Sequence, residues 1–318
     1  MKELYLCEQK ENIPWIYGVD APVFTREELL AEPEKFRDTQ VIFSTWGMPC
    51  LTQEEIARVL PKLQAVFYAA GTVQAFARPF LAQGVQVFSA WAANAVPVAE
   101  YTVAQILLAN KGFFRVMRYT DKKAAFALAQ TYPGNFGSRV GIIGAGMIGK
   151  MVIRLLKSYD LEVLVFDPFL PDAAAKDLGV EKVALEEIFS RCQVVSNHLA
   201  NNAQTKGMLC GELFSKMLPC ATFLNTGRGA QVVEEELIAT LQARPDLTAI
   251  LDVTSPEPPV ADSPLYSLPN CILTPHIAGS TGNEVRRMGQ YMQAEYARWL
   301  AGTPCPYEVT EEMLATMA

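Results

Sequence analysis

The 318-residue sequence predicts an α/β protein with two doubly wound parallel-sheet domains. Short apolar runs alternate with longer amphipathic segments, which is the pattern of βα units. A glycine-rich motif follows one of these runs near the middle of the chain. About 140 residues precede the motif, enough for a folded unit of their own, so the sequence predicts two domains.

The central motif is Gly144-x-Gly146-x-x-Gly149, between an apolar run at 140–143 and an amphipathic segment at 147–157. Gly144 would let the chain leave a strand in a tight turn, and Gly146 would let a pyrophosphate approach the backbone. Gly149 would let the following helix pack closely on the strand and direct its free N–H groups at the phosphates. The order of strand, motif and helix predicts a Rossmann-like unit that binds a dinucleotide. A chance glycine turn is the alternative.

An acidic residue at a suitable distance supports the dinucleotide interpretation. Asp167 ends the apolar run 163–166 and lies 18 residues after Gly149. A carboxylate at this place can accept both ribose hydroxyls and repels a 2′-phosphate, so NAD is the expected cofactor rather than NADP. Met147 and Ile148 lie in the first turn of the predicted helix and complete the expected cofactor-binding segment.

Residues 1–96 are predicted to alternate short strands and helices. Two capping boxes, Thr25-x-x-Glu28 and Thr52-x-x-Glu55, indicate where two of the helices begin. Apolar content predicts strands at 41–45, 64–69 and 85–88.

A long helix with an apolar stripe is expected at 98–117, with Pro97 in its first turn, where a missing N–H is tolerated. Beyond the glycine motif, βα units continue, which predicts a parallel, doubly wound sheet. The further strands are expected at 163–166, 193–196, 221–225, 247–251 and 271–273. The further helices are expected near 171–178, 211–217, 232–243 and 280–300.

The mid-chain position of the cofactor unit predicts an insertion. Residues 97–281 would form the NAD-binding Rossmann domain. Residues 1–96 and 282–318 would together form a discontinuous, flavodoxin-like substrate domain. A second substrate is then expected in a cleft between the two domains.

Composition excludes several classes of partner. The net charge of −7 argues against nucleic acid and against an anionic membrane surface. The chain has no run of eighteen apolar residues and no signal-peptide-like start, so a cytoplasmic protein is expected. The seven cysteines include no Cys-x-x-Cys pair, and the two histidines lie far apart, so neither disulfides nor a metal site is expected.

Three polar side chains follow predicted strands of the cofactor domain: Arg228, Glu257 and His276. Ligands bind at the carboxyl ends of parallel strands, so these side chains are candidates for chemistry. Histidine exchanges a proton near neutral pH, a carboxylate can orient it, and arginine binds a carboxylate through two parallel hydrogen bonds. Each residue also has an ordinary alternative, namely a surface salt bridge, a solvated loop acid and a structural histidine.

Seven ordered motifs resemble the D-isomer-specific 2-hydroxyacid dehydrogenases, the family of D-lactate, glycerate and D-3-phosphoglycerate dehydrogenases. The similarity covers residues 94–300 most clearly. Besides the glycine motif, the matching segments are 94–100, 167–169, 197–199, 225–229, 252–258 and 275–279.

The resemblance implies that His276 is the acid–base residue, that Glu257 orients it, and that Arg228 binds the substrate carboxylate and carbonyl. It also implies a homodimer built around the cofactor domain. Further cofactor contacts are expected at His198, Thr226, Gly227, Asp252 and Gly279, and substrate contacts at Gly71 and Thr72.

The chain also departs from the family pattern. Ala200 stands where proline is usual, and the loop 69–74 lacks the second glycine and the acid that often follow. Trp46 and Met48 either line the substrate pocket or belong to the domain core. Residues 40–80 contain no basic cluster, which favours a small 2-keto acid such as glyoxylate or hydroxypyruvate. The alternatives are D-3-phosphoglycerate dehydrogenase itself and a non-catalytic, NAD(H)-sensing protein similar to the C-terminal-binding-protein corepressors.

Overall fold

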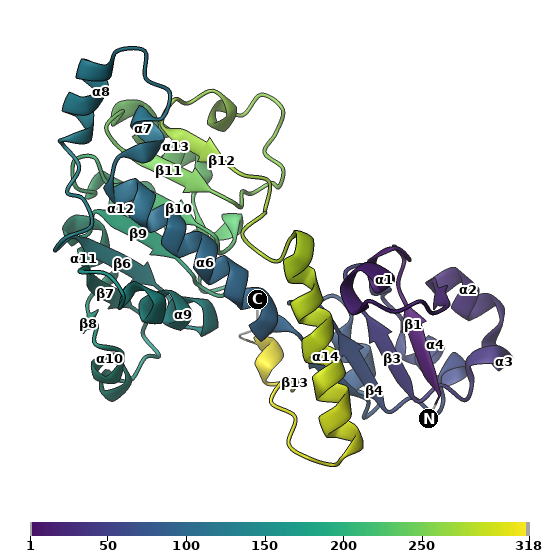
Figure 1. The fold of residues 1–318 in the computed structure, drawn as a ribbon. Helices are drawn as coiled ribbons and strands as arrows, with labels where there is room; N and C mark the ends of the chain where they lie inside the picture. Colours follow the sequence, from purple (N-terminus) through teal and green to yellow (C-terminus); the bar gives the residue numbers. More distant parts are fainter. Residues whose placement is uncertain (1, 316–318) are drawn as a thin grey trace. The chain divides into compact units, whose positions relative to one another are not determined.

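A computed structural model describes residues 2–315 of the chain. It divides into two compact units (Figure 1). The first unit consists of the residues up to Asn94 and those from Ser280 onward, and the second unit is Ala95–Gly279. The division lies two residues before each of the two boundaries that the sequence suggested. Among residues 2–315, none of the helices combines the length and apolarity needed to span a bilayer.

The first unit contains a six-stranded sheet in the order β13-β5-β4-β3-β1-β2. Its strands are β1 (Glu3–Leu6), β2 (Val23–Phe24), β3 (Val41–Ser44), β4 (Ala65–Tyr68), β5 (Gln86–Ser89) and β13 (Glu308–Val309). The first five are parallel, and their order 2-1-3-4-5 is that of flavodoxin-like sheets. β13 pairs antiparallel with β5, so the segment near the end of the chain extends the sheet.

The helices of the first unit begin where local sequence caps them. They are α1 (Asn12–Tyr17), α2 (Arg26–Ala31), α3 (Pro33–Phe36), α4 (Gln53–Val59), α5 (Ala77–Leu81) and α14 (Val285–Leu300). Both expected capping boxes are confirmed. Thr25 and Thr52 accept the N3 amides through their hydroxyls, at 3.3 and 3.2 Å, and Glu28 and Glu55 bond back to the N-cap amides at 2.9 Å.

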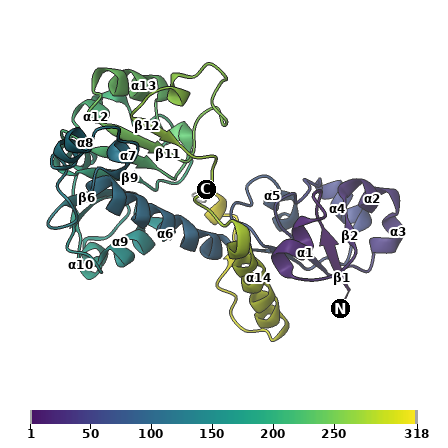
Figure 2. The same cartoon turned by 45° about the horizontal axis from the view of Figure 1, so that its top comes forward.

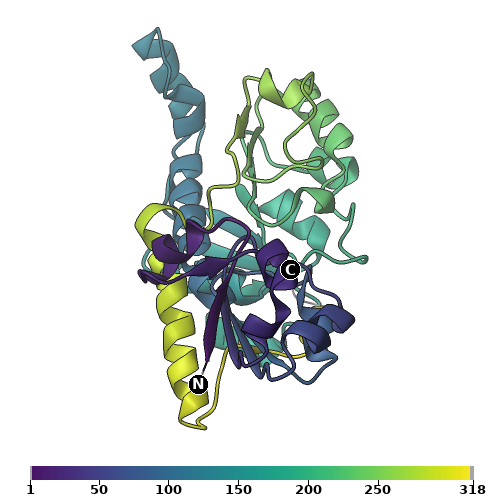
Figure 3. The same cartoon turned by 90° about the vertical axis from the view of Figure 1, so that its right-hand side faces the viewer.

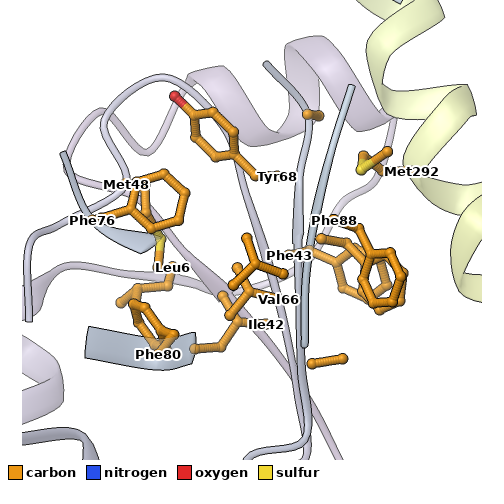
Figure 4. Packing of buried hydrophobic residues seen from close by; sticks show 14 of the residues in the cluster. Leu6, Ile42, Phe43, Met48, Val66, Tyr68, Phe76, Phe80, Phe88 and Met292 are labelled. Atoms are coloured by element: carbon orange, nitrogen blue, oxygen red, sulfur yellow. The ribbon is translucent and has the colours of Figure 1, made fainter. Parts of the chain in front are cut away.

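Aromatic packing holds one face of this sheet to α14. Phe67 stacks on Phe43 and Phe88, with ring centroids 5.5 and 4.6 Å apart. Tyr296 of α14 meets both Phe43 and Phe67 edge-on, at 5.1 and 5.3 Å. Figure 3 shows α14 running alongside the strands of this unit. On the opposite face Leu6, Ile42, Val66 and Phe80 form the other part of the core, as Figure 4 shows.

The second unit contains a seven-stranded parallel sheet in the order β12-β11-β10-β9-β6-β7-β8. Its strands are β6 (Arg139–Ile143), β7 (Glu162–Phe166), β8 (Glu181–Lys182), β9 (Val194–Asn197), β10 (Thr222–Asn225), β11 (Thr248–Leu251) and β12 (Cys271–Leu273). Numbered within this unit, the order begins 3-2-1-4-5-6, which is the Rossmann order. The prediction of two doubly wound α/β sheets is confirmed.

Helices cover both faces of this sheet (Figure 2). One core is formed by the strands with α6 (Trp91–Asn110), α9 (Met147–Leu156) and α10 (Asp172–Leu178). The other is formed with α11 (Leu185–Arg191), α12 (Gly211–Ser215) and α13 (Glu234–Ala243). Two further helices, α7 (Phe113–Val116) and α8 (Lys122–Ala129), follow α6.

The predicted bounds of the helix at 98–117 are wrong, because the helix begins and ends earlier in the chain. α6 begins at Trp91, and Pro97 lies inside it rather than in its first turn. The alanine-rich residues before Pro97 favour a helix, and their amides bond back into the preceding turn, as Asn94 N does to Ala90 O at 3.1 Å. The helix ends at Asn110 because Gly112 adopts a left-handed conformation, with φ 66°.

A buried carboxylate on α14 holds the segment that contains Tyr307. Glu295 is fully buried, accepts the backbone N–H of Tyr307 at 2.7 Å, and is paired with Arg298 at 2.7 Å. Tyr307 O in turn accepts the amide of Ser89 at 3.1 Å. Glu295 therefore positions the segment that supplies β13.

We expect Glu295→Ala to lower the free energy of unfolding of the first unit by about 2–4 kcal/mol, because it leaves the Tyr307 amide and Arg298 without their acceptor. Urea unfolding followed by tryptophan fluorescence measures this unit selectively, since all four tryptophans (Trp15, Trp46, Trp91 and Trp299) belong to it. Glu34→Ala is the control. Its pair with Arg37 is exposed, so we expect a change below about 0.5 kcal/mol. Equal effects in the two variants would contradict the role of Glu295.

Candidate functional site

The glycine motif follows β6 and allows two close backbone approaches. Gly144 has φ 90°, and a Cβ there would lie 2.8 Å from the carbonyl oxygen of His198. A Cβ on Gly149 would lie 2.0 Å from the carbonyl oxygen of Gly144, so only glycine lets α9 pack this close to the turn. A Cβ on Gly146 would meet nothing within 4 Å, so the motif is open on that side.

The beginning of α9 offers free backbone N–H groups. Gly146 is the N-cap, and Lys150 N donates to Gly146 O at 3.1 Å. The amides of the first turn before Lys150 therefore lack intrahelical acceptors and can bind an anion, which fits a pyrophosphate. Met147 is exposed and Ile148 is half-buried against the core beside α9.

Asp167 follows β7 and is tied to the glycine motif. Its Oδ2 accepts the amide of Ala145 at 2.7 Å, and its Oδ1 accepts the amide of Phe169 at 2.8 Å. Each bond uses one lone pair of a carboxylate oxygen, which leaves acceptor capacity for ribose hydroxyls. The structure thus places a carboxylate acceptor beside the glycine turn, where the sequence predicts the adenosine ribose of NAD.

His198 lies directly after β9 and is buried. Its Nε2 is 2.9 Å from the Ser196 hydroxyl and its Nδ1 is 3.5 Å from the Thr226 hydroxyl. Burial lowers the pKa of the His198 imidazole to about 3, so the ring is neutral near pH 7. A buried ring that is neutral near pH 7 is suited to packing and positioning rather than to proton transfer.

Arg228 lies in the turn after β10 and is flanked by two glycines without room for side chains. A Cβ on Gly229 would lie 2.0 Å from the backbone carbon of Thr254, and one on Gly227 would lie 2.8 Å from Gln231 Oε1. The Arg228 Nη1 donates to the carbonyl of Gly227 at 2.8 Å. Burial lowers the pKa of Arg228, so an anionic ligand would have little water to compete with there.

Glu257 and His276 form a hydrogen-bonded pair. The distance between Glu257 Oε1 and His276 Nδ1 is 2.6 Å, and both side chains are partly exposed. The charge of Glu257 also acts on Arg228, where it opposes the effect of burial on the arginine pKa. All three residues belong to the second unit, and the structure brings them together.

His276 is held in a left-handed backbone conformation, with φ 56°, which is uncommon for a residue other than glycine. Asp252, buried at the end of β11, supports this turn. Its carboxylate accepts the Thr274 hydroxyl at 2.6 Å and the amides of Ile277 and Ala278 at 2.8 and 2.9 Å. These bonds fix the loop that carries His276, while the expected contact of Asp252 with the cofactor stays a prediction.

The expected substrate loop lies in the first unit, after β4. Among residues 2–315, the backbone amides of Gly71, Thr72 and Val73 have no hydrogen-bond acceptor. The carbonyl of Gly71 accepts the Ser89 hydroxyl at 2.5 Å, which holds the loop. Three adjacent free amides can bind a carboxylate oxygen. Met48 is buried in the core of this unit.

Several polar residues that support these loops were not predicted as a group. Asn197, Asn225 and Gln231 are fully buried and hydrogen-bonded to one another. Polar residues at the ends of apolar strands were the available signal. Thr226, at the same edge, is buried beside the Thr102 hydroxyl, and Gly279 is the last residue of the second unit. The described residues contain no group of three acidic, cysteine or histidine side chains that could hold a metal ion.

Comparison with known proteins identifies the family of the second unit. A family model for the NAD-binding domain of D-isomer specific 2-hydroxyacid dehydrogenases matches residues 103–278. The D-3-phosphoglycerate dehydrogenase of Mycobacterium tuberculosis is 29% identical over 301 residues, which cover 93% of this chain and 54% of that protein. The Bacillus subtilis protein of the same name is 29% identical over 221 residues, which cover 70% and 42%. The chain spans about half the length of the curated relatives it matches.

Solved structures share the fold. The D-lactate dehydrogenase of Treponema pallidum has a TM-score of 0.74 and 22% identity, with coverage of 98% of this chain and 100% of that chain. The apo D-mandelate dehydrogenase of Rhodotorula graminis has a TM-score of 0.78 and 20% identity, with 98% coverage of both chains. Identities this low establish the fold alone.

The neutral state of His198 predicts a pH dependence of stability. The unfolded chain binds a proton at His198 as the pH falls below about 6.5, whereas the folded chain does not until about pH 3. The contribution of His198 to the free energy of unfolding is therefore complete above pH 6.5 and is lost as the pH falls below it. The loss is about 2 kcal/mol between pH 7 and pH 5. In His198→Gln we expect the free energy of unfolding to fall by about 2 kcal/mol less between pH 7 and pH 5 than in the unaltered protein. Urea unfolding followed by circular dichroism measures this difference. An unchanged pH dependence would show that His198 is not buried in its neutral form.

Proposed function

The chain belongs to the D-isomer-specific 2-hydroxyacid dehydrogenase family, and we propose that it interconverts a small D-2-hydroxy acid and its 2-keto acid with NAD(H). The single observation that carries this proposal is the hydrogen-bonded pair of Glu257 and His276. Arg228 is close enough for the charge of Glu257 to raise its pKa against the effect of burial. Within one NAD-binding unit, His276 can exchange a proton, Glu257 can orient the imidazole ring, and Arg228 can bind an anionic substrate.

The residues present fit NAD. The open glycine turn and the free amides that begin α9 would hold the pyrophosphate, and Asp167 would accept the ribose hydroxyls. The remaining contacts that we propose are His198, Thr226, Gly227, Asp252 and Gly279, which lie at or near the same sheet edge. When bound, NAD(H) supplies the acceptor or donor of the hydride.

His276 is the proposed acid–base residue. With Nδ1 bonded to Glu257, its Nε2 is left to exchange a proton with the substrate oxygen. In oxidation the ring would take the hydroxyl proton, and in reduction the imidazolium would donate a proton to the carbonyl oxygen. Glu257 would keep the ring oriented through both steps and stabilise the imidazolium.

Arg228 is the proposed partner of the substrate carboxylate and carbonyl. Its planar guanidinium suits a carboxylate, and its partial burial strengthens the interaction. Within the first unit, the free amides of Gly71 and Thr72 are proposed substrate contacts, because adjacent backbone amides can bind a carboxylate oxygen.

The substrate side chain is proposed to be small and uncharged. The segments that follow β1, β3, β4 and β5 contain one basic residue, Lys10, which is paired with Glu28 at 2.7 Å. At this edge Tyr68 is 7% exposed, and its hydroxyl points away from the apolar cluster in Figure 4. Arg78, in α5, donates to Gln74 Oε1 at 3.1 Å. The described segments hold no cluster of basic side chains, which supports pyruvate, glyoxylate or hydroxypyruvate over a phosphorylated acid. The curated D-3-phosphoglycerate dehydrogenases share only part of their length with this chain.

A homodimer is proposed from an exposed apolar segment of the second unit. Figure 3 shows the α7–α8 region extending beyond the rest of that unit. The exposed large apolar residues between 108 and 136 are Leu108, Phe113, Met117, Tyr119, Phe126, Leu128 and Phe136. Exposed apolar side chains at this density, here interspersed with basic ones, are typical of a surface that a second copy covers.

We expect NADH oxidation with pyruvate, glyoxylate or hydroxypyruvate and none with 3-phosphohydroxypyruvate, followed by absorbance at the NADH band. His276→Ala should lower kcat by about 10²–10⁴-fold because the proton then has no carrier, while calorimetry should show unchanged NADH affinity. Unchanged turnover in that variant would remove His276 from the mechanism. If the unaltered protein binds NADH and reduces none of these acids, the NAD(H)-sensing alternative is favoured.

We expect the protein to sediment as a dimer and Phe126→Asp to sediment as a monomer, because the substitution places a charge in the proposed interface. Leu300→Asp, on the exposed end of α14 in the first unit, is the control and should leave the dimer intact. Sedimentation velocity measures both. A Phe126→Asp variant that remains dimeric would contradict this interface.

A further inference from the structure

Three amide side chains form a hydrogen-bonded group at the carboxyl edge of the second sheet, with Asn197 bonded to the other two. Asn197 ends β9, Asn225 ends β10, and Gln231 follows the Arg228 turn. All three are buried, with exposed fractions of 0, 1 and 0%. Asn197 Nδ2 donates to Asn225 Oδ1 at 3.0 Å and to Gln231 Oε1 at 2.6 Å. A buried amide group of this kind is stable only when its hydrogen bonds are made.

This group holds the backbone on both sides of Arg228. The amide of Arg228 donates to Gln231 Oε1 at 3.1 Å, and the amide of Gly227 donates to Asn225 Oδ1 at 3.0 Å. The carbonyl of Arg228 accepts Asn225 Nδ2 at 3.3 Å. The amide side chains pack directly on Gly227, because a Cβ there would lie 2.8 Å from Gln231 Oε1 and 2.9 Å from Asn197 Nδ2.

Gln231 also joins the Arg228 turn to the segment after His198. Its Nε2 donates to the carbonyls of Leu199 and Ala200 at 2.8 and 3.0 Å. Ala200 is the position where the sequence departs from the usual proline. Gln231 thereby uses its oxygen for one loop and its nitrogen for the other, so one side chain bonds to both loops.

We propose that Gln231, oriented by Asn197, is a positioning residue that sets the backbone of Arg228 for binding the substrate carboxylate. The inference rests on the proposed function. Neither residue needs to touch the substrate or NAD. Gln231 fixes the Arg228 amide, and Asn197 fixes the side-chain oxygens of Gln231 and Asn225 that the turn depends on.

The main variant is Gln231→Leu, which removes the acceptor of the Arg228 amide and both donors to the neighbouring loop. We expect it to raise KM for the 2-keto acid at least tenfold with NADH affinity within about twofold of the unaltered protein. Gln242→Leu, an exposed glutamine on α13, is the matched control and should leave KM unchanged.

Asn197→Ala provides an independent test should Gln231→Leu fold poorly, since it leaves the Gln231 contact with Arg228 in place. We expect a smaller rise of KM in the same direction. Added to Gln231→Leu, it should raise KM less than the product of the single effects, because the two residues act through one group.

The outcomes separate the two proposals. Absence of turnover in the unaltered protein contradicts the proposed function. Turnover with KM unchanged in both Gln231→Leu and Asn197→Ala, and only a lowered Tm, contradicts the positioning role and leaves the function standing.

Discussion

The parallel arrangement of the second sheet is the constraint on which the candidate site depends. Because β6, β9, β10, β11 and β12 run in one direction, the segments that follow them all emerge at one edge. The glycine turn, the His198 segment and the loops of Arg228, Glu257 and His276 are therefore neighbours although more than 130 residues separate the first from the last.

Buried polar groups then give each loop one conformation. Asp252 accepts three hydrogen bonds from the His276 loop, and the amide group that includes Gln231 holds the Arg228 turn. Charges and amides in an apolar interior are costly unless every partner is present, so a displaced loop would leave several groups unsatisfied. The partly exposed pair of Glu257 and His276 therefore lies on a loop that the buried Asp252 holds in place.

Close backbone packing is the second source of rigidity. Gly149 and Gly229 each face backbone atoms of another segment at a distance that excludes a Cβ. In both places a helix or turn lies directly on the chain it supports, without side chains between them. The motif glycines therefore serve the packing of the unit as well as the approach of a ligand.

The sequence by itself determined the two sheets, the capping boxes of α2 and α4, and the polar residues at strand ends, because periodicity and local motifs report directly on burial and backbone conformation. Only the tertiary structure decided where α6 begins, that residues 308–309 add a strand, and that Asn197, Asn225 and Gln231 form one group. The alanine-rich residues before Pro97 are compatible with a helix, but the preference of proline for the first turn predicted a start that is too late. Strand pairing and side-chain hydrogen bonds between distant residues depend on register and packing, which no local pattern contains.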